Sequence, residues 1–248
     1  MGIFGNIFKS NKLKSPIDLS ILGADMHSHL IPGIDDGCAT LEDSVNLVKH
    51  MYDLGYKKLI TTPHIMVDYF KNTAETINKG LDILRNELAK ENIPVIIEAA
   101  AEYMFDDGLL KKFKAGNLLT FGNKYLLIEL STFNPPDNLI HTFFDMRMEG
   151  YNPVLAHPER YFFWHENIEH YETLKDHEIL FQINIPSLSG FYSPGVKKIC
   201  EELIEKNMVD FAGSDLHNME YFMHLDKSRF SPALEKLINS GNLLNNKL

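Results

Sequence analysis

The sequence has few cysteines and no long hydrophobic run, and each absence excludes a class of protein. Its two cysteines, Cys38 and Cys200, lie far apart with no second thiol near either, so neither a disulfide framework nor a thiolate zinc site is predicted. No run reaches the ~18 consecutive apolar residues of a membrane span, and the first residues lack the apolar stretch and cleavage site of a signal peptide. We therefore expect a cytoplasmic protein without a membrane span.

Positive charge is also scarce, because 24 Lys and Arg stand against 34 Asp and Glu, for a formal net charge of −10. Binding to a nucleic-acid backbone depends on clustered Lys and Arg, and no dense basic run occurs, so we expect no nucleic-acid partner. The 248 residues suit one large domain, and a single (β/α) barrel takes ~250 residues. We expect residues 1–16 to form a flexible tail and residues 17–248 to form one catalytic domain.

Short apolar runs alternate with stretches of helical periodicity, which is the pattern of repeated βα units. The runs do not alternate strictly between apolar and polar residues, as expected for strands that are buried on both faces of a parallel sheet. The seven predicted strands are residues 22–26, 58–62, 94–100, 125–130, 153–156, 180–185 and 209–212. Between them, Thr40 and Asp43 can form a capping box before a helix that ends at Gly55, and Ser193 with Pro194 can begin another helix.

Polar residues that can bind metal lie at or just after the end of nearly every predicted strand. A closed barrel brings these ends together in a ring, whereas the outer strands of an open sheet lie too far apart to share ions. The sequence therefore favours a barrel with its site at the C-terminal face of the strands. The residues at these positions are Asp25, His27, His29, Asp35, Asp36, His64, Glu102, Glu129, His157, Glu159, Arg160, Asn184, Asp215 and His217.

The spacing within two of these groups suits metal binding. His27 and His29 lie two residues apart, and side chains at that spacing on an extended segment point to the same side. Asp215 and His217 have the same spacing. Imidazole mixed with carboxylate suits zinc, iron or manganese, and carboxylates can bridge neighbouring ions into a centre that hydrolyses phosphoesters. A multinuclear metallohydrolase is the chemical interpretation.

The ordered motifs resemble those of the polymerase and histidinol phosphatase superfamily, and within it the bacterial manganese-dependent protein tyrosine phosphatases of capsule and exopolysaccharide gene clusters. The resemblance covers the chain from Asp25 to His217. It implies a distorted, TIM-like seven-stranded (β/α) barrel that holds three divalent metal ions. The motifs that carry it are His27-Ser28-His29, Asp35-Asp36-Gly37, Thr62-Pro63-His64, His157-Pro158-Glu159-Arg160 and Ser214-Asp215-Leu216-His217-Asn218.

The resemblance also implies roles for individual residues. Arg160 contacts the phosphate and offsets charge that develops in the transition state. Asp25, Asp35 and Asn184 orient the ligands or water. The implied ligand sets are His27, His29, Glu102 and Asp215 for the first ion, Glu102, Glu129 and His157 for the second, and Asp36, His64 and His217 for the third.

One departure from the family concerns phosphate binding. The family often has a second arginine a few residues after its last motif, where this chain has residues 219–224, Met-Glu-Tyr-Phe-Met-His. His224, Lys227 or Arg229 can take its place, or the phosphate is held differently. We therefore assign the phosphate contact to Arg160 alone.

The mechanism expected from this centre is attack on phosphorus by a metal-activated water. The thiol mechanism of other tyrosine phosphatases requires Cys-x5-Arg, but Ser44 and Lys206 stand six residues beyond the two cysteines. That route is therefore excluded. Iron, cobalt and zinc are alternatives to manganese, because all of them accept this ligand mixture.

The resemblance implies a phosphoric monoester hydrolase that acts on phosphotyrosine, with the tail of a polysaccharide-export tyrosine kinase as its partner. Aromatic residues after the strands, Tyr69, Tyr161, Tyr192 and Tyr221, are candidates for contact with the substrate. Three alternatives stay open: a phosphatase for histidinol phosphate or another small molecule, a nuclease, and a metal-bound phosphotyrosine-binding module that has lost turnover.

Overall fold

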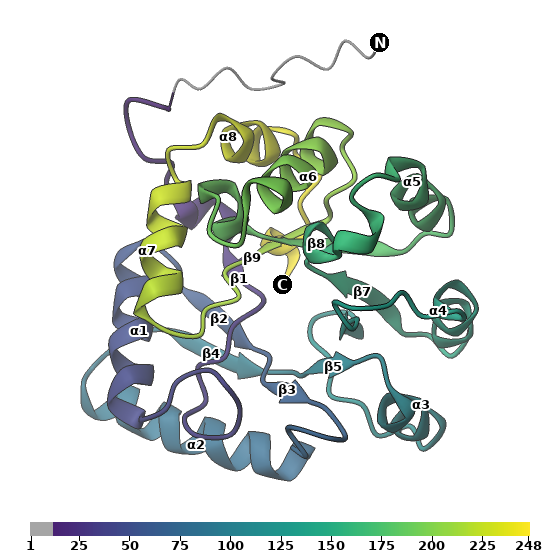
Figure 1. Cartoon of the computed structure of the whole chain (residues 1–248). Helices are drawn as coiled ribbons and strands as arrows, with labels where there is room; N and C mark the ends of the chain where they lie inside the picture. Colours follow the sequence, from purple (N-terminus) through teal and green to yellow (C-terminus); the bar gives the residue numbers. More distant parts are fainter. Residues whose placement is uncertain (1–11) are drawn as a thin grey trace.

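Parallel strands form the centre of the molecule and helices surround them (Figure 1). The computed structural model describes residues 12–248. The strands are β1 (Ala24–Asp25), β2 (Lys58–Thr61), β3 (His64–Ile65), β4 (Ile96–Ala99), β5 (Glu102–Met104), β6 (Tyr125–Glu129), β7 (Asn152–Ala156), β8 (Leu180–Asn184) and β9 (Phe211–Gly213). The α-helices are α1 (Leu41–Asp53), α2 (Ala74–Lys90), α3 (Asp107–Lys114), α4 (Leu139–Met148), α5 (Ile168–Asp176), α6 (Pro194–Glu205), α7 (Met219–Ser228) and α8 (Pro232–Asn239).

Each of the seven predicted strands overlaps an observed strand, but β3 and β5 were not predicted. The short strand β3 follows β2, and β5 follows β4, each after a bend in the chain. The first bend falls at Thr62 and Pro63, where proline lacks the N–H that a ladder needs, and the second at Ala100 and Ala101. As a result, β1, β2 and β4 form one sheet, and β3 and β5 to β9 form another.

Backbone hydrogen bonds join the two sheets into a ring. A parallel bridge links Ser28, after β1, to Leu216, after β9, and His29 N donates to Leu216 O at 2.9 Å. Thr62 N donates to Ser28 O at 2.6 Å, and Glu102 N donates to Thr62 O at 3.2 Å. The pairs within both sheets are all parallel. The predicted distorted seven-stranded barrel is therefore confirmed.

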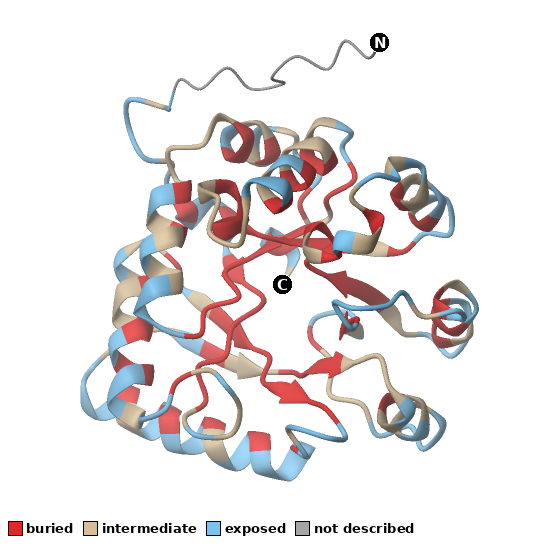
Figure 2. Ribbon diagram, in the orientation of Figure 1, coloured by how far each residue is buried: buried red, intermediate tan, exposed pale blue. Residues whose placement is uncertain are grey.

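The strands of this ring are largely buried (Figure 2), and two clusters of apolar side chains support them. Met26, Ile60, Leu127, Val154 and Phe211 form a small buried cluster with side chains from strands around the ring. A larger cluster packs the helices against the outside of the strands. The helices begin where the sequence signals them, since the predicted capping box precedes α1 and a serine caps the proline start of α6.

The chain ends seal the amino side of the barrel. A short helix, η5 (Asn245–Lys247), places the Asn245 amide between β1 and β9, where it donates to Ala24 O and Ala212 O and accepts from Ala212 N. The predicted tail lies largely outside the described residues, but within its described part Leu13 N donates to Phe230 O at 3.0 Å. Among the helices of residues 12–248, none is long and apolar enough to cross a membrane.

Candidate metal centre

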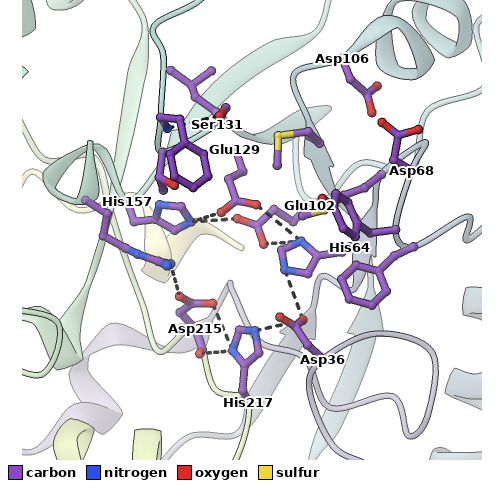
Figure 3. Close-up of a pocket in the computed structure, with 18 of the residues that line it drawn as sticks. Asp36, His64, Asp68, Glu102, Asp106, Glu129, Ser131, His157, Asp215 and His217 are labelled. Atoms are coloured by element: carbon purple, nitrogen blue, oxygen red, sulfur yellow. Dashed lines mark hydrogen bonds and ion pairs between the residues drawn. The ribbon is translucent and has the colours of Figure 1, made fainter. Parts of the chain in front are cut away.

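The predicted metal-binding side chains converge above the carboxyl ends of the strands. His64 and Glu102 begin the short strands β3 and β5, so the two bends in the barrel bring them into the ring. His157 follows β7 directly and Asp215 lies two residues beyond β9, both with positive φ, which is uncommon for residues other than glycine. Figure 3 shows seven members of the cluster facing a common centre: Asp36, His64, Glu102, Glu129, His157, Asp215 and His217.

The first group of donors contains His27, His29, Glu102 and Asp215. His27 Nε2 lies 3.2 Å from both Glu102 Oε2 and Asp215 Oδ1. His29 Nε2 lies 3.3 Å and 3.5 Å from the same two oxygens, and 3.4 Å from His27 Nε2. Ligands ~2.1 Å from a tetrahedral ion stand ~3.4 Å from one another. The four side chains therefore fit one metal ion.

Two further groups adjoin the first. Asp36 Oδ1 lies 3.5 Å from both His64 Nε2 and His217 Nε2, and His29 belongs to the same group. Glu102 and Glu129 form the other group with His64, whose Nδ1 is 3.2 Å from Glu102 and 3.7 Å from Glu129. The imidazole of His64 thus faces two groups with its two nitrogens, a sharing that the sequence did not suggest.

His157 also borders the pair of glutamates. Its Nε2 lies 3.1 Å from Glu102 Oε1 and 3.6 Å from Glu129 Oε1. Glu102 therefore contacts donors from every side of the cluster, through Oε1 and Oε2 separately. Its position matches the bridging role that the resemblance implies.

Buried polar atoms without partners show that this cluster suits cations. Within the described residues, Glu102 Oε2, Glu129 Oε2 and His64 Nδ1 are buried and make no hydrogen bond. Burial and the neighbouring Glu102 carboxylate hold the pKa of Glu129 well above its usual value. Such groups are costly to bury unless they are paired or coordinate a metal. Divalent ions would compensate the carboxylates and occupy the unpartnered atoms.

The imidazoles are turned by hydrogen bonds on their far sides. His27 Nδ1 lies 2.8 Å from Gln182 Oε1, His29 Nδ1 lies 2.8 Å from Asp35 Oδ2, and His217 Nδ1 lies 2.8 Å from Asp215 O. Each contact leaves Nε2 directed at the donor groups, which is how outer partners orient metal-binding histidines. Asp35 is placed as predicted for this role. Gln182 was missed, although it precedes Asn184 by two residues on β8 and shares its face.

The charges follow from burial and these pairings. Burial disfavours a charged His27, but Glu102 and Asp215 outweigh burial and raise the pKa of His27 to about 9. Burial lowers the pKa of His64 and His157 to about 4. Burial acts against ionised Asp35, but His29 outweighs it and lowers the pKa of Asp35 to about 2. The two neutral imidazoles are in the state that a metal ligand requires.

Two residues predicted to orient ligands take different positions. Asn184 Nδ2 donates to Asp215 Oδ2 at 2.6 Å, so it does orient a member of the first donor group. Asp25 accepts hydrogen bonds from Ser214 N and Ser214 Oγ at 2.8 Å and 2.7 Å. It therefore fixes the end of β9 against β1, and among the described residues its hydrogen bonds reach Ser214 and no imidazole.

Arg160 lies beside the donor groups and is held from two directions. Its Nη1 donates to Asp215 Oδ2 at 3.2 Å, and its guanidinium carbon lies 4.5 Å from the centre of the Tyr192 ring. Tyr192 Oη donates to the same Asp215 oxygen at 3.1 Å. These contacts place a fixed positive charge at the edge of the centre, where it can pair with two oxygens of a phosphate.

A cavity of about 440 Å³ opens above the centre. Donor residues and Arg160 line its floor, while Tyr69 and Phe133, which are 82% and 86% exposed, stand at its wall. Tyr221 also lines it, as predicted. Tyr161 does not, because it is fully buried and its hydroxyl joins Ala156 O to Leu130 N, so the expected substrate contact is wrong.

The candidates for a second phosphate-binding cation lie elsewhere. His224 Nδ1 contacts Ser189 Oγ at 2.7 Å, and Arg229 binds Asp226 and the carbonyl of Ile17. Neither lines the cavity, nor does Lys227. Among the described residues that line it, Arg160 is the only lysine or arginine.

Neither cysteine lines the cavity. Both are buried and free. Burial raises the pKa of Cys38 to about 11 and that of Cys200 well above its usual value. Neither can supply a thiolate nucleophile near neutral pH, in line with the exclusion made from the sequence.

Comparison with known proteins gives a consistent group of relatives. The family model described as capsular polysaccharide synthesis, CpsB/CapC, matches residues 23–228. The tyrosine-protein phosphatase YwqE of Bacillus subtilis is 30% identical over 197 residues, which are 79% of this chain and 78% of YwqE. The tyrosine-protein phosphatase CpsB of Streptococcus pneumoniae is 30% identical over 204 residues, which are 79% of this chain and 83% of CpsB.

Solved structures agree with the sequence comparison. One from the pair YwqE of B. subtilis and CpsB of S. pneumoniae, described as metal-dependent tyrosine phosphatases, matches with a TM-score of 0.79 and 28% identity. That match covers 90% of this chain and 89% of the other. An amidohydrolase from Mycoplasma synoviae, with a TM-score of 0.55 and 11% identity over 94% of this chain and 87% of its own, shares the fold alone.

Proposed function

The chain belongs to the CpsB/CapC family of capsular polysaccharide synthesis, and on this premise we propose that it is a metal-dependent phosphatase that hydrolyses phosphotyrosine in proteins. The observation that carries the proposal is the convergence of three donor groups, two of which share Glu102, below a cavity that Arg160 borders. Such a centre holds a phosphate between cations and a guanidinium, which is what phosphoester hydrolysis needs.

The proposed centre takes three divalent ions, with manganese as the native metal. His27, His29, Glu102 and Asp215 hold the first ion. Glu102, Glu129 and His157 hold the second, and Asp36, His64 and His217 hold the third. The separations of 3.1 to 3.6 Å between these donor atoms support the assignment. The mixture of imidazole and carboxylate, with no sulfur donor, accepts manganese as it accepts zinc or iron, and the choice of manganese rests on the family resemblance.

When bound, the ions supply Lewis acidity and lower the pKa of a water that attacks phosphorus in line. The protein's own groups hold the substrate. Arg160 pairs with nonbridging oxygens of the phosphate, and Tyr192 and Asp215 keep its guanidinium in place. Gln182 and Asp35 keep the Nε2 atoms of His27 and His29 directed inward.

The shape of the cavity favours phosphotyrosine over phosphoserine. The donors of its floor are nearly covered, with His64 6% and Glu129 8% exposed. A phosphotyrosine side chain carries its phosphate much farther from the peptide backbone than phosphoserine does, so it can reach a recessed floor. Tyr69 and Phe133 at the wall can contact its ring.

We further propose a physiological partner and a compartment. The partner is the tail of a bacterial tyrosine kinase that controls polysaccharide export, because relatives carry capsule-synthesis names. The compartment is the cytoplasm, where both free cysteines stay reduced.

The test measures phosphate release from a phosphotyrosine peptide, a phosphoserine peptide and histidinol phosphate, before and after metal removal and after addition of manganese, iron, cobalt or zinc separately. We expect release from phosphotyrosine only, restored best by manganese. His27→Ala should abolish it, because it removes a donor from the first group. His141→Ala is the matched control, since His141 is an exposed histidine on α4, with its side chain 78% exposed.

Other outcomes would reassign the function. Release chiefly from histidinol phosphate would make the protein a small-molecule phosphatase on the same barrel. Binding of phosphotyrosine peptide without release, by protein shown to contain metal, would make it a binding module. Equal loss of activity in both histidine variants would show that the assay does not report on this centre.

A further inference from the structure

The side chains that line the cavity supply few positive charges for a bound phosphate dianion. A tyrosine phosphate has three nonbridging oxygens, and among the described lining residues only Arg160 is a lysine or arginine. Oxygens that face neither a metal nor Arg160 need uncharged donors. Tyrosine, serine and threonine hydroxyls on the wall can supply them.

Tyr221 is the hydroxyl best held for this purpose. Its ring stacks on His217 with centroids 4.7 Å apart, and it meets Phe191 edge-on at 4.7 Å. The Asn218 side chain accepts hydrogen bonds from Glu220 N and Tyr221 N, which fixes the first turn of α7. The ring is therefore immobilised against a predicted metal ligand. By contrast, Ser131 and Thr132 are exposed at the outer wall.

The hydroxyl of Tyr221 is also unengaged. Within the described part of the chain it has no hydrogen-bond partner, whereas the nearby Tyr192 hydroxyl donates to Asp215 and accepts from Asn184. Tyr192 lies between Arg160 and Tyr221. The centre of its ring is 4.5 Å from the Arg160 guanidinium and 6.3 Å from the centre of the Tyr221 ring. Arg160 and Tyr221 thus border the same part of the cavity.

We propose that Tyr221 Oη donates a hydrogen bond to a nonbridging oxygen of the bound phosphate, beside Arg160. The inference rests on the proposed phosphatase function and names a phosphate-binding residue for it. A tyrosine hydroxyl is protonated at neutral pH, because its ordinary pKa is about 10, and it can therefore donate to an anion. Tyr221 would bind phosphate through its hydroxyl and not by stacking its ring on the substrate.

The test compares Tyr221→Phe with wild type in protein loaded with manganese. The phenylalanine keeps the ring contacts with His217 and Phe191 and removes only the hydroxyl. Calorimetry gives the dissociation constant of inorganic phosphate, which has no aromatic ring. Kinetics give kcat/KM for p-nitrophenyl phosphate and for a phosphotyrosine peptide. Tyr151→Phe is the matched control, because the Tyr151 hydroxyl also has no partner among the described residues and lies away from the cavity.

We expect Tyr221→Phe to raise the dissociation constant of phosphate about tenfold or more, as for loss of a hydrogen bond to a charged group. The value of kcat/KM should fall by a similar factor for both substrates. Metal content, melting temperature and all values for Tyr151→Phe should stay as in wild type. Phosphate affinity and kcat/KM within twofold of wild type would overturn the inference, and so would a lower metal content that accounts for the loss.

The phosphate measurement separates this inference from the proposed function. If wild type binds phosphate, Tyr221→Phe binds it weakly and neither protein hydrolyses phosphotyrosine, the contact stands and the proposed function fails. If wild type hydrolyses phosphotyrosine and both proteins bind phosphate equally, the function stands and the contact is refuted.

Discussion

Replacing Gln182, the only glutamine in the chain, by leucine tests how the outer hydrogen bonds support the metal centre. Its Oε1 accepts from His27 Nδ1 at 2.8 Å and from His157 N at 3.4 Å, and its Nε2 donates to Ile183 O at 2.7 Å and to Asn184 Oδ1 at 2.9 Å. Leucine has a similar volume and makes none of these hydrogen bonds. The substitution therefore takes a partner from four buried polar groups and frees the His27 imidazole to rotate.

The magnitude follows from these contacts. Each buried polar group that loses its partner costs ~1 to 3 kcal/mol, so the free energy of unfolding should fall by roughly 3 kcal/mol or more. In a protein of this size, 1 kcal/mol corresponds to ~2 to 4 °C, which predicts a melting temperature lower by roughly 6 to 12 °C. Loss of an outer partner of a metal-binding histidine typically weakens metal binding ~10- to 100-fold.

Asn245→Leu is a matched control at the other end of the barrel. Asn245 makes three hydrogen bonds, one from Ala212 N and one each to Ala24 O and Ala212 O, and it too is buried. Its removal should lower stability by a similar amount without touching an imidazole. Metal affinity, measured by competition with a chelator, should therefore fall in Gln182→Leu only.

The result that would refute this reasoning is equal metal affinity in the two variants. It would show that packing around His27 sets the imidazole without the help of Gln182. A loss of affinity in both variants would show that general destabilisation, and not the Gln182 contact, weakens metal binding.

Three further predictions concern other buried groups. Burial raises the pKa of Glu159 from 4.5 to about 7, so folded protein keeps a proton that unfolded protein loses, and stability falls as pH rises from about 4.5 to 7. In metal-free protein, Glu159→Gln should remove this loss of about 3 kcal/mol in the free energy of unfolding. Denaturant unfolding at pH 5 and 8 measures it, and an unchanged pH dependence would contradict the raised pKa of Glu159. Tyr161→Phe should lower the free energy of unfolding by ~1 to 3 kcal/mol with KM unchanged, whereas a substrate contact would raise KM. Iodoacetamide at pH 8 should leave Cys38 and Cys200 unmodified by mass spectrometry and activity intact, and inactivation that tracks alkylation of either cysteine would contradict their burial.

Hydrophobic periodicity and the residues that begin and end helices were enough to predict the main elements of the fold. Most of the predicted strands are buried on both faces, so each shows an apolar run, and the helix starts carry caps such as Thr40 with Asp43. The strands β3 and β5 escaped because they have only two and three residues and begin with the polar residues His64 and Glu102, outside any apolar run. No periodicity can be recognised over so short a segment, and their pairing is set by the neighbouring strands.

The sequence could predict which residues meet at the candidate site, but it could not predict which contacts each of them makes there. Position at a strand end brings a residue into the ring wherever the barrel closes. The two-sided placement of His64, between Asp36 and Glu102, depends on ring orientation, which the sequence does not encode locally. Tyr161 shows the converse error, because an aromatic residue near a strand end can equally turn inward and join two strands.

The bends that sequence reasoning missed are also what makes the centre compact. A straight β2 would continue its ladder through Thr62 and Pro63, but proline ends that ladder and the chain resumes as β3 with His64 at its start. The parallel register of β3 with β5 then sets His64 opposite Glu102, and their side chains approach to 3.2 Å. The two ring nitrogens of His64 and the two carboxylate oxygens of Glu102 can therefore bind neighbouring ions from adjacent strands. The local break in the sheet is the feature that lets three donor groups share one small space.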